Sequence, residues 1–265
     1  MKISVVVTTY NRPDALEKVI EALQNQKSHP HEILVADDGS GPETRDLVEE
    51  CRKRSSIPLV HVWQKDKGFR LSRSRNRAVL AASGDYILFL DGDCVPDIHF
   101  VGDHGALARE GWFFQGKRIL VNEGAETDFH FSQANSLVSR LAMALKGKID
   151  NAHHIFRIPF FPVMEKKKLS GIRSCNMGMF KSDIMAVNGF NNAFQGWGRE
   201  DSEFVSRLMA YGVRRQEHPF KAICYHLWHP ENSRENLERN DEILAETLAA
   251  KRHWCDDGIT HIQGS

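Results

Sequence analysis

The sequence predicts an α/β protein built on an open, doubly wound and mostly parallel sheet. Near-continuous runs of β-branched and aliphatic residues alternate with segments whose apolar residues recur every three or four positions. Such runs are typical of strands buried on both faces of a parallel sheet, and their alternation with helices favours β-α-β units. In these sheets ligands bind outside the carboxyl ends of the strands, so the residues that follow each run are the first functional candidates.

The first hundred residues carry the clearest alternation. The predicted strands are residues 3–9 (ISVVVTT), 32–37 (EILVAD), 59–64 (LVHVWQ) and 85–93 (DYILFLDGD). The predicted helices are residues 11–26, 42–54 and 71–83. Pro13 falls in the first turn of the first helix, where its missing N–H removes no helical hydrogen bond.

The alternation weakens after residues 112–121 (WFFQGKRILV). A helix is expected over about 132–146, and residues 156–168 (FRIPFFPVMEKKK) are aromatic and basic without clean periodicity. This segment is expected to form an ordered loop over the functional site or to dip into a membrane interface. Further helices are expected over 199–211 and 232–253.

Composition narrows the class of protein. Lysine and arginine together equal aspartate and glutamate at 35 each, so no global field draws the chain toward nucleic acid or an anionic membrane. The five cysteines are scattered, which argues against a disulfide framework or zinc module and fits a reduced cytosol. No apolar run approaches the ~20 residues that span a bilayer. A single domain is expected, with halves 1–121 and 122–230 and a helical extension over 231–265.

Four carboxylates close the second and fourth predicted strands. Asp37 and Asp38 end the second, and Asp91 and Asp93 end the fourth. In a parallel sheet all four project from one edge, where such a cluster needs a cation or hydrogen-bond donors. The DGD sequence is therefore a divalent-cation candidate, in which Asp93 reaches the ion and Gly92 lets the backbone approach. An ordinary Asp-Gly turn is the alternative.

The stretch KDKGFRLSRSRNR is suited to an anion such as a diphosphate. Gly68 precedes a predicted helix whose first turns offer free N–H groups, and Arg70, Arg73, Arg75 and Arg77 surround it. Arg70, Arg73 and Arg77 share one helix face, so a solvated basic surface is the alternative, but Arg75 points elsewhere. We therefore expect at least two of them to face a ligand.

Two later motifs add candidate ligands and acids. In YHLWHP, one of His226 and His229 could complete the coordination that Asp93 begins, although a pair of histidines in an exposed turn is the alternative. In GWGREDSEF, the glycines allow a tight turn around Trp197, and Glu200 and Asp201 open a helix. Acids are favoured at a helix start whatever their function. Taken together, the motifs predict transfer from a metal-bound nucleotide diphosphate donor to a hydroxyl acceptor.

Several motifs resemble a known group of enzymes. SVVVTTYNRPDAL, VADDGS and FLDGDCVP resemble the N-terminal signature of inverting glycosyltransferase family 2, with the GT-A fold. GFRLSRSRN with GWGREDSEF is similar to the C-terminal pattern of β-1,4-galactosyltransferases and of bacterial chondroitin-polymerase-type transferases. The resemblance covers about residues 3–229 in the same order. It implies that residues 1–121 bind the nucleotide sugar and that 122–230 form the acceptor and catalytic half.

The resemblance also implies roles for individual residues. The nucleotide base would be held around Thr9, Tyr10, Arg12 and Asp38. Gly68, Arg70 and Arg75 would hold the ribose or diphosphate. Asp91 would bind the ribose or the metal-bound donor, and Asp93 would bind Mn²⁺ or Mg²⁺ with His226 preferred as a partner and His229 left open. Asp201 would be the general base, while Trp197, Gly198 and Glu200 would shape the acceptor or donor-sugar site.

Unlike these relatives, the protein is expected to have no second transferase domain, membrane anchor or stem. The expectation is a bacterial cytoplasmic enzyme, soluble or at the inner face of the cytoplasmic membrane. It would move a hexose or N-acetylhexosamine from a nucleotide sugar, with UDP preferred, to a glycan or lipid-linked glycan during lipopolysaccharide or polysaccharide synthesis, forming a β-linkage.

Two other functions remain to be weighed. A nucleotidyltransferase usually needs a glycine-rich phosphate loop after the first strand, where this chain reads TTYNRP. A non-catalytic glycan- or nucleotide-binding protein would not depend on Asp93 and Asp201. No nucleic-acid partner is expected.

Overall fold

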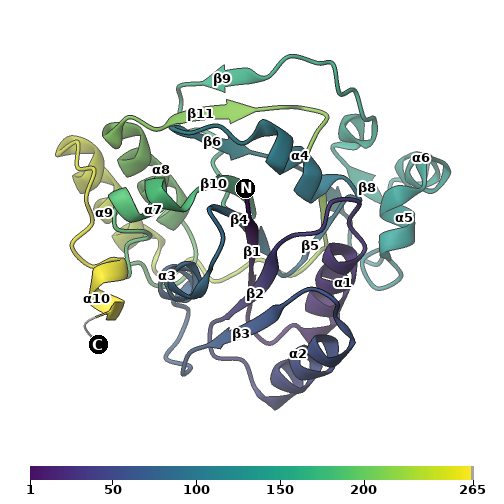
Figure 1. Ribbon diagram of the computed structural model, residues 1–265, viewed down its shortest axis with the longest axis horizontal. Coiled ribbons are helices and arrows are strands. Elements are labelled where there is room, and N and C mark those ends of the chain that lie inside the picture. The colour runs from purple at the N-terminus through teal and green to yellow at the C-terminus, as the bar shows by residue number, and fades with distance from the viewer. Residues whose placement is uncertain (264–265) are drawn as a thin grey trace.

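Most strands of the described residues belong to one large sheet. The computed structural model describes residues 1–263 (Figure 1). The strands of this sheet are β1 (Ile3–Thr9), β2 (Glu32–Asp37), β3 (Leu59–Trp63), β4 (Tyr86–Asp91), β6 (Trp112–Gln115), β9 (Met164–Lys166), β10 (Asn176–Phe180) and β11 (Arg214–Glu217). Within residues 1–263 they form an eight-stranded sheet in the order β3-β2-β1-β4-β10-β6-β11-β9. Only β10 and β9 run against the others, which confirms a mostly parallel α/β sheet.

A smaller sheet branches from the first. Its order is β5 (Cys94–Pro96), β12 (Ile223–His226), β7 (Lys117–Val121) and β8 (Ile149–Asp150). The parallel pair β6 and β11 in the large sheet continues as the parallel pair β7 and β12 here. Gly116 separates β6 from β7 and lies so close to the Asn176 side chain that a Cβ would overlap it. The two halves expected from the sequence, 1–121 and 122–230, therefore both contribute strands to each of the two sheets.

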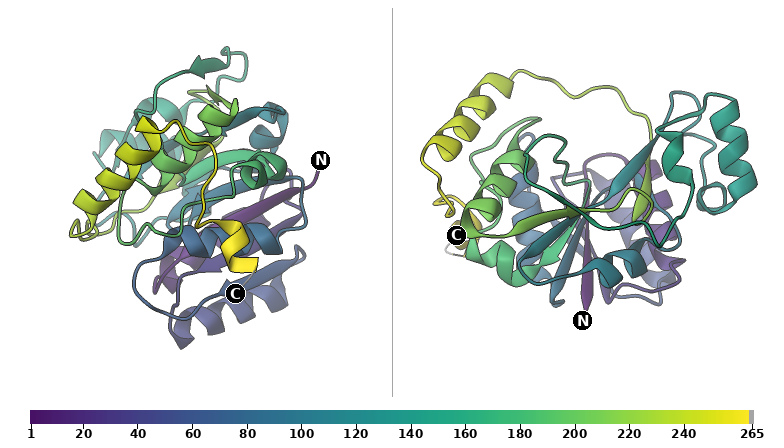
Figure 2. Two further views of the ribbon diagram at one scale, coloured as in Figure 1. Left: turned by 90° about the vertical axis from the view of Figure 1, so that its left-hand side faces the viewer. Right: turned by 90° about the horizontal axis from the view of Figure 1, so that it is seen from above.

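Helices cover both faces of the large sheet, as Figure 2 shows. On one side lie α1 (Pro13–Gln24), α2 (Pro42–Arg54) and α4 (Phe100–Leu107). The same core continues to α5 (Phe131–Asn135), α6 (Leu137–Leu145) and the 3₁₀ turn η1 (Ala152–Ile155), which contact the small sheet. The other side packs α3 (Leu71–Ala81), α7 (Lys181–Ala186), α8 (Glu200–Tyr211) and α10 (Ile259–Gln263), while α9 (Leu237–Ala249) lies against α8.

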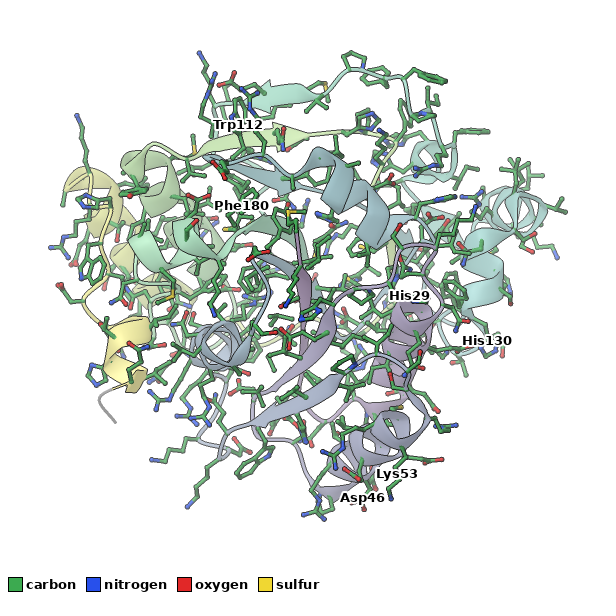
Figure 3. The ribbon with its side chains drawn as sticks, viewed as in Figure 1. His29, Asp46, Lys53, Trp112, His130 and Phe180 are labelled. Carbon is green, nitrogen blue, oxygen red and sulfur yellow. The ribbon has the colours of Figure 1, made fainter. Side chains whose placement is uncertain are left out.

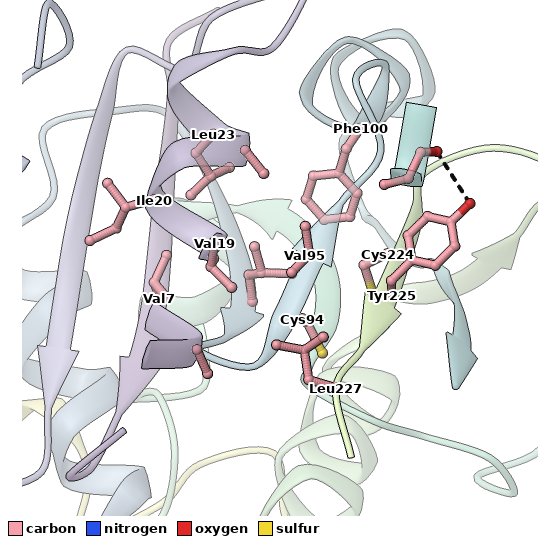
Figure 4. Close-up of a cluster of buried hydrophobic side chains, with 14 of the residues drawn as sticks. Val7, Val19, Ile20, Leu23, Cys94, Val95, Phe100, Cys224, Tyr225 and Leu227 are labelled. Carbon is pink, nitrogen blue, oxygen red and sulfur yellow. Dashed lines mark hydrogen bonds between the residues drawn. The ribbon is translucent and has the colours of Figure 1, made fainter. Parts of the chain in front are cut away.

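Successive residues of one strand belong to opposite cores. Val5 and Val7 of β1 face the α1 side and Val6 faces the α3 side, as the alternation of a strand requires. On the α1 side, Val19 and Leu23 lie near Val7 in a cluster that extends to β5 and β12 (Figure 4). The carboxyl ends of β1, β2 and β4 are thereby held side by side.

Three expected elements differ in extent. The helix expected over 132–146 is two helices, because Ser136 leaves the helical conformation and its Oγ accepts the N–H of Ser139 at 3.2 Å to cap α6. The helix expected over 232–253 covers Leu237–Ala249. The strand expected over 85–93 covers Tyr86–Asp91, and the Gly92 N–H makes the last ladder hydrogen bond to β1, to the Thr8 carbonyl at 2.7 Å.

The segment expected over 156–168 is partly a strand. Its residues 164–166 form β9 at the outer edge of the large sheet, beside β11. Within residues 1–263, no helix combines the length and the apolar character needed to cross a bilayer.

A buried ion pair fixes the start of α8. Glu203 stands in the first turn, as expected of a polar helix start, but its side chain is only 1% exposed and accepts from Arg207 at 2.8 Å. The Arg207 guanidinium also donates to the carbonyls of Val187 and Gly189 at 2.6 and 2.8 Å. Helix α8 is therefore tied to the loop that follows α7.

We expect Arg207→Ala to lower the free energy of unfolding by about 3–5 kcal/mol, because it leaves the Glu203 carboxylate buried without its partner. Urea denaturation measures the effect. The matched control is Arg214→Ala, which removes an exposed pair with Glu165 and should change stability by at most about 1 kcal/mol. Equal losses in the two variants would contradict this account of α8.

Candidate active site

Asp93, His226 and His229 form a cluster with the donors of a metal site. Each offers a ligand atom, and these atoms all lie within 4.8 Å of one another. His226 Nε2 is 3.7 Å from Asp93 Oδ1, and His229 Nε2 is 3.4 Å from Asp93 Oδ2. The pairing of β12 with β5 sets this geometry, because the Leu227 N–H donates to the Asp93 carbonyl at 2.8 Å. The sequence preferred His226 and left His229 open, and the structure brings both histidines beside Asp93.

The two imidazoles are suited to ligation. Burial lowers the pKa of His226, the Asp93 carboxylate opposes this effect, and the Arg118 guanidinium adds to it, so the ring is favoured in the neutral form that binds metals. His229 Nδ1 lies 2.7 Å from the Pro230 carbonyl, which leaves Nε2 directed at Asp93.

Arg12 belongs to this cluster. Its Nη1 lies 3.5 Å from Asp93 Oδ2, so its guanidinium stands beside the candidate metal ligands, and its place at the nucleotide base stays a prediction. With Trp228 and His229 it also lines a cleft of about 580 Å³ between α1 and residues 126–130. Lys18 of α1 fixes the far wall by donating to the carbonyls of Glu126 and Thr127. The cleft thus opens directly beside the candidate metal ligands.

A second cluster lies at the ends of β1 and β2. Asp38 is buried and accepts from the Arg70 N–H at 2.6 Å and from Gln64 Nε2 at 2.5 Å. Burial raises its pKa, and these hydrogen bonds oppose the rise. Thr9 Oγ1 is buried without a partner, and Tyr10 is half exposed and donates to Asp66 at 3.1 Å. An unpaired polar atom beside an exposed ring is suited to a planar polar ligand.

The turn before α3 completes this cluster. Gly68 has a φ of +81°, and its N–H donates to Asp66 Oδ1 at 2.9 Å. Arg70 donates from its side chain to the Lys65 carbonyl. Of the other arginines, Arg77 donates to the Trp63 carbonyl at 3.4 Å. Arg70 therefore lies beside Asp38 through its backbone N–H, and Gly68 forms the turn that precedes it.

Arg75 joins two acids from distant parts of the chain. Its side chain is 1% exposed, and its Nη2 lies 3.1 Å from Asp91 Oδ1 while its Nη1 lies 3.4 Å from Glu200 Oε1. Asp91 also accepts from Thr8 Oγ1 at 2.9 Å. The buried guanidinium therefore joins the two carboxylates, and a role for Arg75 at the ribose or diphosphate stays a prediction.

The GWG turn has a left-handed backbone that glycine adopts without strain, in agreement with the tight turn expected around Trp197. Gly196 and Gly198 have φ of +69° and +105°, and the Gly196 N–H donates to the Phe69 carbonyl at 3.1 Å. Trp197 is half exposed, with the Arg234 guanidinium 5.6 Å from its ring centroid. The turn therefore lies against the residues around Gly68 and presents an aromatic face.

Asp201 is placed to exchange a proton. Burial and the neighbouring Glu200 carboxylate raise its pKa to about 7, against the opposing charge of Arg75. Its Oδ1 accepts only from Ser202 of its own helix, at 2.6 Å from the backbone N–H and 3.3 Å from the hydroxyl. A carboxyl group with a pKa near neutral is suited to general acid or base chemistry.

Several neighbours of the site carried no signal in the sequence. Gln64 and Asp66 stand in a loop, Arg118 lies in a strand with no motif, and Asn240 belongs to a polar helix. Asn240 is buried and donates to the carbonyls of Gln195 and Gly198, so α9 supports the GWG turn from behind. These contacts depend on tertiary structure and not on local pattern.

Comparison with known proteins agrees with this geometry. The profile described as Glycosyl transferase family 2 matches residues 4–173, and that described as N-terminal domain of galactosyltransferase matches residues 156–230. The hyaluronan synthase of Pasteurella multocida is 30% identical over 79% of this chain and 23% of its own length. The chondroitin synthase of Escherichia coli is 28% identical over 79% of this chain and 32% of its own length. The chain thus spans a third or less of these two relatives.

Solved structures share the fold. Staphylococcus aureus TarS 1-349 matches with a TM-score of 0.65 at 19% identity, over 95% of this chain and 68% of that one. A mannosyltransferase from Pyrobaculum calidifontis, in complex with GDP-Man and Mn²⁺, matches with a TM-score of 0.53 at 18% identity, over 84% of this chain and 56% of that one. At these identities the likeness shows the GT-A glycosyltransferase fold alone. Since the first profile covers well over half of its residues, this chain belongs to glycosyl transferase family 2.

Proposed function

We propose that this glycosyltransferase is an inverting, metal-dependent enzyme. It moves a hexose or N-acetylhexosamine from a UDP-linked donor to a hydroxyl of a glycan or lipid-linked glycan, and it forms a β-linkage in the synthesis of a bacterial surface polysaccharide or lipopolysaccharide. It acts in the cytoplasm or at the inner face of the cytoplasmic membrane. The observation that carries the proposal is Arg75, which links Asp91 at the donor strand to Glu200 beside Asp201.

The donor set fits a divalent cation that accepts both oxygen and nitrogen ligands. Asp93 supplies a carboxylate, and His226 and His229 supply imidazoles whose free nitrogens face it. Such a mixed set favours Mn²⁺ over Mg²⁺, which prefers oxygen ligands alone. A cation held there would neutralise charge on the diphosphate leaving group.

The donor is proposed from the base cluster and from the neighbours. Asp38 and the unpaired Thr9 hydroxyl offer polar groups beside the half-exposed Tyr10 ring. TarS structures carry UDP or UDP-GlcNAc, while the mannosyltransferase carries GDP-Man. The relatives named as hyaluronan and chondroitin synthases support a role in polysaccharide synthesis.

Asp201 is proposed as the general base. Its carboxylate takes the proton of the acceptor hydroxyl as that oxygen bonds to the anomeric carbon, and the bond from that carbon to the diphosphate oxygen breaks on the opposite face. Trp197 offers an apolar face against which a sugar ring packs. Glu200, fixed by Arg75, holds its charge beside Asp201 and so keeps the pKa of the base high enough to accept a proton.

Asp201→Asn should reduce kcat by about 10²–10⁴-fold, because the proton acceptor is lost while the shape of the side chain is kept. Release of UDP from UDP-glucose, UDP-galactose and their N-acetylated forms, with Mn²⁺ and acceptor present, measures turnover. Calorimetric titration with UDP should give nearly wild-type affinity. The exposed Asp46→Asn on α2 is the control, and full turnover by Asp201→Asn would refute the assignment.

The same variant should alter the pH dependence of stability. The folded protein keeps the Asp201 proton up to a pH of about 7, whereas the unfolded chain releases it near the ordinary pKa of 3.8. Rising pH between these values therefore destabilises the wild type, and Asp201→Asn escapes this loss. Its melting temperature should exceed that of the wild type at about pH 8 and match it near pH 4. A constant difference across this range would contradict the raised pKa.

Asp93→Ala should weaken Mn²⁺-dependent donor binding by about 10–100-fold or more, because one of the three candidate ligands is lost. Titration of Mn²⁺ followed by electron paramagnetic resonance measures it, with the exposed Glu123→Ala as control. EDTA should abolish wild-type turnover and added Mn²⁺ should restore it. Turnover that persists in EDTA would exclude the metal-dependent mechanism.

A further inference from the structure

Helix α6 turns its apolar face outward. Leu137, Leu141 and Leu145 repeat every four residues, and Val138 lies on the same side. Val138 is 78% exposed and Leu145 is 89% exposed. Met143, on the opposite side, is the buried residue of this helix. An amphipathic helix whose apolar stripe faces away from the core is the reverse of the usual arrangement in a globular protein.

A second apolar surface lies in the segment between η1 and β9. Phe160 is 94% exposed, and Phe156, Ile158 and Val163 are each about half exposed. The segment is nevertheless held in place. Arg157 forms a two-bond ion pair with Asp103 at 2.5 and 2.6 Å, so the exposed side chains project from a fixed backbone.

The two surfaces are neighbours at the same edge of the protein. Helix α6 contacts η1, and the segment starts there and runs to β9 along the outer edge of the sheet (Figure 1). Met164, the first residue of β9, pairs with Glu217, the last of β11. Residues 156–163 therefore lie at the carboxyl end of β11, which is the edge that carries the candidate active site along β1 and β4.

The surroundings of these surfaces are basic. Residues 129–168 contain seven lysines and arginines but only two acids, although the whole chain has 35 of each sign. Lys146 and Lys148 follow α6, and Lys166, Lys167 and Lys168 follow the apolar segment; all five are exposed. Cations that border protruding aliphatic and aromatic side chains complement an anionic lipid surface, where the apolar groups enter the interface and the lysines meet the headgroups.

We propose that the outer face of α6 and residues 156–163 form a docking surface for an anionic lipid membrane. The exposed apolar stripe and Phe160 insert at the interface, and the five lysines hold the headgroups. The cleft beside Asp93 is lined by His130, which precedes α5 and is labelled in Figure 3, so docking places this cleft near the lipid. The surface stands independently of the proposed sugar transfer.

Cosedimentation of the whole chain with vesicles tests the proposal. The protein should bind vesicles of phosphatidylcholine with phosphatidylglycerol and bind those of phosphatidylcholine alone at least about tenfold more weakly. Val138→Glu with Leu145→Glu, and separately Phe160→Glu, should each reduce binding by about tenfold or more, since one inserted large apolar side chain contributes about that much. The exposed Leu248→Glu on α9, on the far side of the molecule, should bind as the wild type does.

A charge-reversal series tests the role of the lysines. Lys146→Glu with Lys167→Glu should weaken binding to anionic vesicles about tenfold or more, whereas Lys53→Glu on α2, labelled in Figure 3, should not. Circular dichroism confirms that each variant is folded. Equal binding to neutral and anionic vesicles, or no binding by the wild type, would overturn the proposal.

Sedimentation velocity separates lipid docking from pairing of two copies. A wild-type monomer at the concentrations used, with the vesicle results above, supports the membrane surface. A dimer that the α6 and Phe160 variants convert to monomers, without vesicle binding by the wild type, would assign the surface to a second copy. Because neither readout needs a sugar donor, failure here leaves the proposed transferase activity untouched.

Discussion

The site depends on one buried cation. Arg75 is removed from water almost completely, so its charge requires partners, and Asp91 and Glu200 supply them from strand β4 and helix α8. These acids come from distant parts of the chain, and the guanidinium fixes the spacing between β4 and the helix that carries Asp201. Arg207, paired with Glu203, holds the same helix against the loop that follows α7. Glu200 and Glu203 look like ordinary helix-start acids in the sequence, but each is paired with a buried arginine.

Burial favours the neutral forms of three groups of the site. It lowers the pKa of His226, raises that of Asp201 to about 7, and raises that of Asp38. These three side chains therefore add less charge to the site than their residue types imply. A dianionic diphosphate and a divalent cation would enter together most favourably, because each compensates the charge that the other brings.

The strands and the first helices were predictable because the β-branched runs and the helical periodicity are strong local signals. The glycines of DGD and GWG are also local signals of turns and close approach. At Gly92 the structure agrees, because a Cβ there would lie 2.5 Å from the Thr8 carbonyl oxygen. The local sequence pattern did not predict the break in the helix at Ser136, where a side-chain cap overrides helix propensity. It also did not predict contacts between segments that are far apart in the chain. The sequence shows the charge of Arg75 but not its burial between Asp91 and Glu200, and it gave no sign of Asn240.

Residues 227–236 connect parts of the site that would otherwise be separate. They leave β12 at His226, carry His229, and reach α9 as an irregular segment that arches across the protein (Figure 2). Arg234 approaches Trp197, Asn236 lies against Gly196, and Asn240 holds the GWG turn. The chain that supplies two candidate metal ligands is thus the same chain that braces the aromatic turn. A cation captured at His229 would restrain this segment, and through Arg234, Asn236 and Asn240 it would restrain the turn that carries Trp197.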